Sequence, residues 1–316
     1  ARSHFNERLF GEQIYGAFKE LKLAFDPKGI MNPGKVVNAP DMDQNLRYGE
    51  SYRAREPQTQ FPYVNEGGFA RAIELCNGAG VCRKNLDGTM CPSYMVTHDE
   101  EHTTRGRANA LRAVLDGRVS SEEFSSKRLY DVMDLCISCK GCKAECPSNV
   151  DMARLKSEFL SLYHRVHPYS IRDRIFSRPE RAGKWGVVFH PVANWLIRQG
   201  WFRSVLESLT GIDHRRSLPP FASQTFEQWF QGRPKTATGK KVVLFHDTFL
   251  NFHEPGIGKA AVAVLEASGF EVQLVNKVCC GRPAISKGML DVARELARRN
   301  VAVLRPFARE GTPIVG

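Results

Sequence analysis

The chain has 316 residues, of which 42% are hydrophobic and 25% charged, and its formal net charge is +11. This length allows two or three compact units, and the lack of any apolar run of about 18 residues excludes a membrane-spanning helix. Seven of the nine cysteines fall into closely spaced sets. Their spacing favours metal binding in a reducing compartment over a disulfide framework, and it predicts a cytoplasmic protein.

The first 40 residues predict one helix followed by a turn. Apolar residues recur at helical spacing over residues 3–24, and Asp26-Pro27-Lys28-Gly29 is a typical helix-ending turn. A lone helix and a turn do not make a domain. We therefore expect the chain to begin inside a larger protein, without a signal peptide.

A family resemblance appears at about residues 15–37. The segment F-K-E-L-K-L-A-F-D-P-K-G-I-M-N-P-G-K-V resembles the C-terminal end of FAD-linked oxidases of the vanillyl-alcohol-oxidase type. These include D-lactate and D-2-hydroxyglutarate dehydrogenases. In that family the N-P-G-K turn closes the substrate and flavin domain. The resemblance implies FAD in the full-length protein and makes Asn32, in this turn, a candidate cofactor-binding residue. Spacing alone predicts only a helix end and a turn.

The most specific motif lies between Cys136 and Pro147, which read C-I-S-C-K-G-C-K-A-E-C-P. The spacing C-x2-C-x2-C-x3-C-P is the bacterial ferredoxin run that holds a [4Fe-4S] cluster. Two-residue gaps let a tight loop reach several irons, and Gly141 permits the close turn. A structural zinc site also uses C-x2-C pairs, but these offsets are less typical of it. The candidate ligands are Cys136, Cys139, Cys142 and Cys146.

A second, imperfect set lies upstream at Cys76, Cys82 and Cys91-Pro92, and Ala79 stands where a ferredoxin run has its middle cysteine. In two-cluster ferredoxins the last cysteine of each run ligates the other cluster. We therefore expect one cluster on Cys136, Cys139, Cys142 and Cys91, and another on Cys76, Cys82 and Cys146. The second set is one thiolate short. A three-iron cluster, a fourth ligand other than cysteine, an open iron, or buried cysteines without a cluster all remain open.

Helices are predicted to alternate with these cysteine loops, at residues 67–75, 121–135 and 150–164, with another after an N-cap at Thr103 or Thr104 that carries Ala108, Leu111 and Leu115. Arg105, Arg107 and Arg112 either offset the negative charge of a thiolate-bound cluster or are ordinary surface arginines. The stretch from Cys76 through C-P-S-N-V-D-M-A-R-L-K-S-E-F resembles the iron–sulfur segment of fused FAD and Fe–S dehydrogenases. It is also similar to the small subunit of anaerobic glycerol-3-phosphate dehydrogenase and to heterodisulfide reductase subunits.

Most of the positive charge is concentrated after the cysteine runs. Residues 154–241 carry 16 Lys and Arg against 6 Asp and Glu, interleaved with tryptophan and phenylalanine. This composition predicts an arginine-rich helical connector. A docking face for an acidic electron carrier or an anionic membrane is the alternative. No nucleic-acid-binding motif is visible, and we expect no nucleic-acid partner.

From residue 240 the pattern predicts a parallel β-α-β-α-β unit. Cys279-Cys280-Gly281 follows its second strand, and adjacent cysteines there form a redox pair, bind metal or simply pack. The Cys-Cys-Gly sequence with this unit resembles the cysteine-rich CCG domain of heterodisulfide reductase and its relatives, in which the pair helps to bind an unusual iron–sulfur cluster. The resemblance makes Cys279 and Cys280 further candidate metal ligands. The chain departs from the pattern, because His246-Asp247-Thr248 follows the first strand without a cysteine and the closing cysteine motif is expected beyond Gly316.

These features predict an α+β multi-domain fragment, incomplete at both ends, with a mainly helical two-cluster ferredoxin-like unit followed by an α/β domain of CCG type. The expected parts are the end of an FAD-linked oxidase domain (1–40), a linker (41–66), a ferredoxin-like Fe–S domain (67–165), a basic helical connector (166–239) and the first part of a CCG-type domain (240–316).

The resemblances imply the bacterial D-2-hydroxyglutarate dehydrogenase-like, D-lactate dehydrogenase-related group. In that reading a D-2-hydroxy acid is oxidised at FAD, and electrons leave through [4Fe-4S] clusters to a quinone, an electron-transfer flavoprotein or a similar carrier. The alternative is an electron-transfer subunit of an anaerobic glycerol-3-phosphate dehydrogenase or a heterodisulfide reductase-like complex. Peripheral contact with the inner face of the membrane is a further hypothesis.

Overall fold

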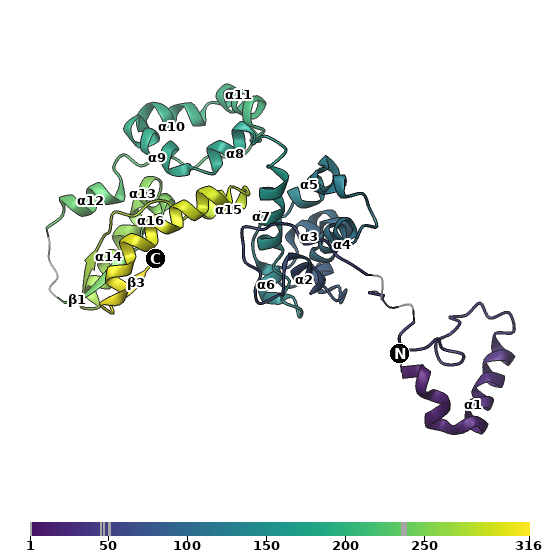
Figure 1. Ribbon diagram of the computed structural model, residues 1–316. Coiled ribbons are helices and arrows are strands. Elements are labelled where there is room, and N and C mark those ends of the chain that lie inside the picture. The colour runs from purple at the N-terminus through teal and green to yellow at the C-terminus, as the bar shows by residue number, and fades with distance from the viewer. Residues whose placement is uncertain (1, 45, 47, 50–51, 235–238) are drawn as a thin grey trace. The chain divides into compact units, whose positions relative to one another are not determined.

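The computed structural model describes residues 2–44, 46, 48–49, 52–234 and 239–316, and Figure 1 shows its helices and strands. The chain divides into two compact units, Ala1–Ala54 and Arg55–Gly316. Part of the predicted linker, at residues 45, 47, 50 and 51, lies outside the described residues. In the part of the chain that is described, every helix is too short or too polar to cross a bilayer.

The first unit is a helix and a returning loop. A 3-10 turn, η1 (Arg2–Phe5), leads into α1 (Asn6–Phe25), which is kinked at Gly11, where φ is 79°. The loop is tied to the helix by Asp26, whose carboxylate accepts the backbone N–H groups of Ile30 and Met31 at 2.9 Å each. A hydrogen bond from Lys22 lowers the pKa of Asp26. Tyr15 and Val37 are buried, but most apolar side chains of α1 are exposed, so this unit buries little apolar surface of its own.

The second unit begins with a helical cluster built around fully buried Phe69, Leu111, Met133 and Phe159. The predicted helix at 121–135 is divided into η4 and α5, because Ser126 is extended and its hydroxyl accepts the Leu129 N–H as an N-cap. The elements of this part are α2 (Phe69–Glu74), η2 (Val81–Arg83), α3 (Pro92–Thr97), η3 (Glu100–His102), α4 (Thr104–Leu115), η4 (Ser121–Ser125), α5 (Lys127–Asp134), α6 (Gly141–Glu145) and α7 (Met152–Tyr163).

Short helices follow through the basic segment, residues 166–239. They are α8 (Ile171–Phe176), α9 (Pro179–Val188), α10 (His190–Arg198), α11 (Gly200–Thr210) and α12 (Phe226–Gly232). Residues 235–238 lie outside the described part. Many apolar side chains on α8 to α11 face solvent, whereas Phe226 of α12 is fully buried in the core of the next domain.

The last part is a small three-stranded parallel sheet in the order β2-β1-β3, covered by helices. Its core contains Val242, Leu244, Val262 and Val272, and the predicted α+β class and β-α-β-α-β order are confirmed. The second helical stretch of this unit is divided into two helices at Gly288, where φ is 70°. The elements are β1 (Lys240–Leu244), α13 (Thr248–Phe252), α14 (Pro255–Ala267), β2 (Phe270–Gln273), α15 (Arg282–Ser286), α16 (Leu290–Arg309) and β3 (Ile314–Val315).

Helix α7 joins the cysteine-rich part to the α/β part. Both α15 and α16 pack against α7, and Figure 1 shows the end of α15 beside it. A Cβ on Gly288 would lie 2.5 Å from Cβ of Leu160, so only glycine fits this contact. The Tyr169 hydroxyl donates to the Gly288 carbonyl at 3.2 Å. Helix α7 therefore contacts both the cysteine-rich part and the helices that follow Cys279 and Cys280.

Candidate functional site

The structure brings Cys91 together with the downstream cysteines. One small cavity is lined by Cys91, Cys136, Cys139 and Cys142, with Met90, Thr104, Arg107 and Met152 among the other wall residues. The loop that carries the downstream cysteines turns back on itself because Ser138 and Lys140 take left-handed conformations, with φ of 55° and 61°. Four thiols from two distant stretches thus surround one space.

A second cavity collects the remaining cysteines of the two runs. Cys76 and Cys82 line it together with Cys146 from the downstream run. Ala79, at the position where a ferredoxin run has its middle cysteine, lines the same cavity. Cys91 of the upstream run thus lines the cavity of the downstream cysteines, and Cys146 of the downstream run lines the cavity of the upstream cysteines. The second space is surrounded by three thiols and one methyl group.

Glu145 places Cys91 at the first cavity. Its carboxylate accepts the backbone N–H groups of Thr89 at 2.6 Å and Met90 at 3.2 Å. These hydrogen bonds lower the pKa of Glu145. Glu145 lies between Cys142 and Cys146 in the sequence. Its hydrogen bonds therefore tie the end of the long insert after Cys82 to the downstream cysteine loop. Sequence reasoning did not identify this residue, although a carboxylate between two ligand positions was the available signal.

A single zinc ion and an iron–sulfur cluster require different distances between the cysteine sulfur atoms. Zinc–thiolate bonds of about 2.3 Å in a tetrahedron put neighbouring sulfurs roughly 3.8 Å apart. Among the described residues, which include all nine cysteines, the groups of three or more metal-binding side chains with ligand atoms within 4.8 Å of one another contain no cysteine. The cysteine sulfurs are therefore not gathered as closely as a four-thiolate zinc site requires, and thiols are the donors that an iron–sulfur cluster takes.

Burial keeps the Cys142 thiol protonated where no metal is bound. Cys142 is 8% exposed, and burial raises the pKa of its thiol to about 11. A coordinating thiol is deprotonated by the metal itself. The site therefore does not supply thiolates by lowering this pKa. A metal bound here would have to displace the proton of this thiol.

Arg107 supplies a cation next to Cys91. Its side chain is fully buried, and its Nη1 donates to Cys91 Sγ at 3.6 Å and to the His102 carbonyl at 2.7 Å. Nε donates to the Val132 carbonyl at 2.9 Å and Nη2 to Ser93 Oγ at 3.0 Å. These described partners are neutral oxygens and one sulfur, so the arginine brings positive charge to the cavity wall. Of the two alternatives for Arg107, an ordinary surface residue is therefore wrong.

Arg105 lines the second cavity, but unlike Arg107 it is paired with a carboxylate. It donates to the Gly78 carbonyl at 3.0 Å and forms a close ion pair with Glu100, with Nε and Oε1 2.7 Å apart. The hydrogen bond from Arg105 lowers the pKa of Glu100. Arg112 is buried as well, but it lines neither cavity.

Lys156 is a further cation that sequence reasoning did not select. It is 7% exposed, and its Nζ donates to the carbonyl groups of Asp134 at 2.9 Å and Cys136 at 2.6 Å. Burial lowers the pKa of Lys156. Its position one helical turn into α7 explains why an amphipathic pattern alone missed it, because lysine at such a position usually faces solvent.

The adjacent cysteines at 279 and 280 form a separate feature. Cys279 is buried and Cys280 exposed, at the start of α15. Asn300 and Glu180 hold this loop, since Asn300 Nδ2 donates to the Cys279 carbonyl at 3.1 Å and Glu180 accepts the Cys279 N–H at 3.2 Å. A hydrogen bond from the Cys280 thiol lowers the pKa of Cys279. The pair therefore favours one thiolate and one thiol, a pattern that suits a nucleophile or a metal ligand.

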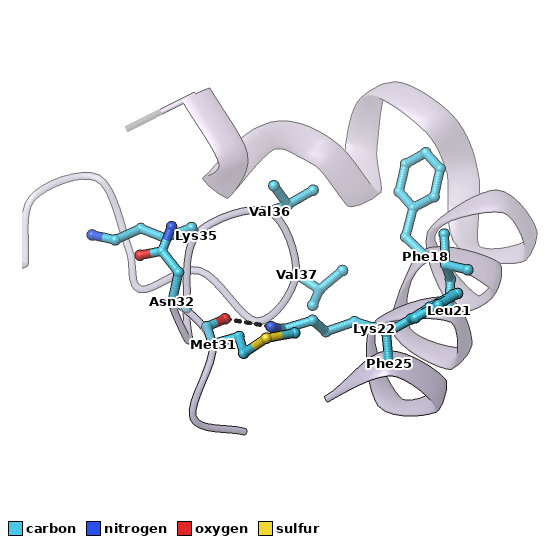
Figure 2. A pocket seen from close by; sticks show the side chains of 10 residues that line it. Phe18, Leu21, Lys22, Phe25, Met31, Asn32, Lys35, Val36 and Val37 are labelled. Atoms are coloured by element: carbon cyan, nitrogen blue, oxygen red, sulfur yellow. Dashed lines mark hydrogen bonds between the residues drawn. The ribbon is translucent and has the colours of Figure 1, made fainter. Parts of the chain in front are cut away.

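Asn32 lies in the first unit, in a pocket between α1 and the returning loop. Figure 2 shows Lys22 reaching to the Met31 carbonyl, with Phe18, Val36 and Val37 around the same space. Asn32 has a φ of 49°, a left-handed turn conformation that asparagine tolerates. The wall is mainly apolar, as a flavin-domain turn facing other parts of such a domain would be.

Comparison with known families assigns the three parts. Residues 1–36 match the FAD linked oxidases C-terminal domain, residues 75–151 the 4Fe-4S dicluster domain, and residues 243–315 the cysteine-rich domain. The chain is therefore an iron–sulfur protein that also contains the C-terminal end of an FAD-linked oxidase domain. The implied cofactors, [4Fe-4S] clusters and FAD, agree with the sequence prediction.

The relatives of the chain come from more than one group of dehydrogenases. The D-2-hydroxyglutarate dehydrogenases of Pantoea ananatis and Escherichia coli match the whole chain at 25% and 24% identity, and the chain spans 35% of the length of each. A subunit of the anaerobic glycerol-3-phosphate dehydrogenase of Escherichia coli is 34% identical over 54% of this chain and 43% of its own length. No solved structure matches the chain significantly. The chain is a relative of the D-2-hydroxyglutarate dehydrogenases over its full length.

Proposed function

We propose that the two cysteine cavities hold two iron–sulfur clusters by exchange of their last ligands. Cys91, Cys136, Cys139 and Cys142 hold a [4Fe-4S] cluster, and Cys76, Cys82 and Cys146 hold the second. The grouping of these seven cysteines around two cavities carries the proposal. A bound cluster supplies one-electron redox chemistry. The protein's own part is to position the thiols, bring Arg107 and Arg105 to the walls, and exclude water.

The missing thiolate at Ala79 gives a direct test of the second site. We expect Ala79→Cys to add a fourth thiolate to the cavity of Cys76, Cys82 and Cys146, raising the iron content by up to about one atom per chain where the wild type holds a three-iron cluster. Iron and sulfide analysis and electron paramagnetic resonance measure this change. Ala144→Cys, an exposed alanine on α6, is the matched control. Equal iron content and identical spectra for wild type and Ala79→Cys would contradict the assignment.

We further propose that the protein carrying this chain oxidises a D-2-hydroxy acid, of D-2-hydroxyglutarate or D-lactate type, at FAD. Its electrons leave through the cysteine-rich unit to an external acceptor, a quinone or an electron-transfer flavoprotein. Support comes from the relatives that match the full chain and from the flavin-domain segment at residues 1–36. The alternative, an electron-transfer subunit such as those of glycerol-3-phosphate dehydrogenase or heterodisulfide reductase, does not account for that segment.

A substrate screen tests the activity. The chain joined to a complete FAD-linked oxidase domain should reduce an artificial dye with D-2-hydroxyglutarate or D-lactate, and much more slowly with the L-enantiomers. Flavin reduction by the substrate should survive Cys139→Ser, whereas acceptor turnover should fall. Failure of every D-2-hydroxy acid to reduce the dye would exclude this function.

A peripheral contact with an anionic membrane is the localisation that the basic segment supports. Trp185, Val188, Val192 and Trp195 are each more than half exposed and recur at helical spacing along α9 and α10. Trp201, Val205 and Leu209 repeat every four residues on α11 and are also exposed. Exposed Arg178, Arg181 and Arg198 accompany these stripes. Apolar stripes with tryptophan and flanking arginine are typical of helices that lie in a membrane interface.

Vesicle flotation tests this contact. We expect the chain to float with vesicles containing phosphatidylserine, to bind less at high salt, and to bind several-fold less after the paired change Trp195→Ser and Trp201→Ser. Leu86→Ser is the control, because Leu86 is 99% exposed but lies outside the stripes. Binding that is the same for the paired variant, or absent for the wild type, argues against a membrane and for another partner of the segment.

A further inference from the structure

A groove on the outer side of the Cys139 loop is not used by the cysteine sites. It is lined by Ser138, Cys139 and Lys140 of the cysteine loop, by Ala153, Arg154 and Ser157 of α7, by Phe61, and by Arg282, Ile285 and Ser286 of α15. Ser138, Cys139, Lys140 and Ala153 also line the cavity that gathers Cys91, Cys136 and Cys142. These four residues therefore form a wall with the cysteine cavity on one face and the groove on the other.

Both cationic and apolar side chains line the groove. Lys140, Arg154 and Arg282 line it, whereas none of its lining residues is acidic. Lys140 pairs with Asp151 and Arg154 with Glu66, at 2.9 Å each. No ion pair is described for Arg282, which is exposed. Phe61, Ala153 and Ile285 supply the apolar surface. Such a groove suits a ligand that has a flat ring and carries an anionic group.

The walls are held in place by buried interactions. Fully buried Glu158 accepts the N–H groups of Gln60 and Phe61 at 2.8 and 2.9 Å, which fixes Phe61 against α7. The Arg154 guanidinium lies 4.0 Å from the centre of the Tyr63 ring. On the opposite side, α15 is anchored by the contact of Gly288 with Leu160. The groove is thus a preformed feature of the second unit.

We propose that this groove binds a small planar electron acceptor that carries an anionic group, such as a sulfonated or carboxylated quinone. This rests on the proposed function, because it places the acceptor against Cys139, a proposed cluster ligand. Reduction of the quinone there takes two electrons, transferred one at a time across the Cys139 wall, and two protons from water, and it yields the hydroquinone. Arg282 binds the anionic group, and Phe61 and Ile285 contact the ring.

Binding is tested without turnover. The cluster-loaded, oxidised chain is titrated calorimetrically with 1,4-naphthoquinone-2-sulfonate, and 2-methyl-1,4-naphthoquinone serves as the uncharged comparison. We expect Arg282→Glu to weaken binding of the sulfonate at least tenfold, and the uncharged quinone much less. Ile285→Trp, which fills the groove, should weaken both. Arg299→Glu is the matched control, because it makes the same charge change on an exposed arginine of α16 outside the groove, and it should change the affinity by less than twofold.

Electron transfer gives the second readout. The chain is reduced with dithionite, freed of excess reductant and mixed with the sulfonate, and the return of visible absorbance is followed. The rate should saturate with quinone concentration in the wild type and in Arg299→Glu, with a half-saturating concentration raised at least tenfold in Arg282→Glu. Affinities and rates that are the same in Arg282→Glu, Ile285→Trp and wild type would overturn the proposal.

The experiment uses no hydroxy acid, so a failure of the dehydrogenase assignment leaves its result unaffected. A failure of the cluster assignment is recognised beforehand as a colourless, iron-free chain. In that case the calorimetric comparison of Arg282→Glu with Arg299→Glu still decides whether the groove binds the anion.

Discussion

Replacing Cys146 by serine is expected to remove the cluster of the upstream cysteines, while the downstream cluster remains. Cys146 belongs to the downstream run in sequence, but it lines the cavity of Cys76 and Cys82. The converse change, Cys91→Ser, is expected to damage the downstream cluster, because Cys91 lines the cavity of Cys136, Cys139 and Cys142. Each variant should lose roughly half of the iron, since each removes one of two sites.

The two variants are distinguished by which signal disappears. Electron paramagnetic resonance of the reduced and oxidised chain separates a four-thiolate cluster from one with three thiolates. Cys280→Ser is the control, because Cys280 is exposed at the start of α15 and lines neither cavity; it should keep both signals. If Cys146→Ser instead lost the same signal as Cys139→Ser, the ligands would follow sequence order, and the crossed arrangement would be wrong.

The fold could be predicted well where local patterns decide it. The β-α-β-α-β order at the C-terminal end follows from short apolar runs separated by a glycine-stopped helix, and Gly269 does end α14 with a left-handed turn. Helix breaks were harder to predict. Ser126 and Gly288 interrupt patterns that look continuous, and the reason for the second break is the packing of Gly288 on Leu160. A contact between residues 128 positions apart leaves no local signal.

In the candidate site, too, some features follow from local sequence patterns and others do not. Cysteine spacing predicted which thiols would gather, because a ferredoxin run has a known crossing of its last ligand. It did not predict the groups that support them. Glu145, Lys156 and Glu158 are charged residues that a pattern assigns to the surface, yet Lys156 and Glu158 are buried. Glu145 and Lys156 hold backbone groups next to the cysteines, and Glu158 holds those of Gln60 and Phe61. Their roles depend on partners that come together only in the folded chain.

Removal of the Arg107 charge is expected to lower the reduction potential of the downstream cluster. Reduction adds a negative charge, which a nearby cation stabilises. Two unit charges about 6 Å apart at an effective dielectric constant of about 20 interact by about 3 kcal/mol, which for a one-electron couple is on the order of 100 mV. Arg107→Gln should therefore shift the potential down by about that amount, and Arg107→Lys, which keeps the charge, by clearly less.

Arg105→Gln provides the reciprocal control for this prediction. Arg105 lines the upstream cavity and Arg107 the downstream one, so each change should move mainly the potential of its own cluster in an anaerobic redox titration. Arg107 also binds backbone carbonyls while fully buried, and its loss should lower the thermal stability of the chain as well. A purely structural role predicts the loss of stability without a selective shift, because Arg107→Lys and Arg107→Gln would then have equal potentials. A difference between those two potentials, confined to the downstream cluster, is what identifies the buried charge as the cause.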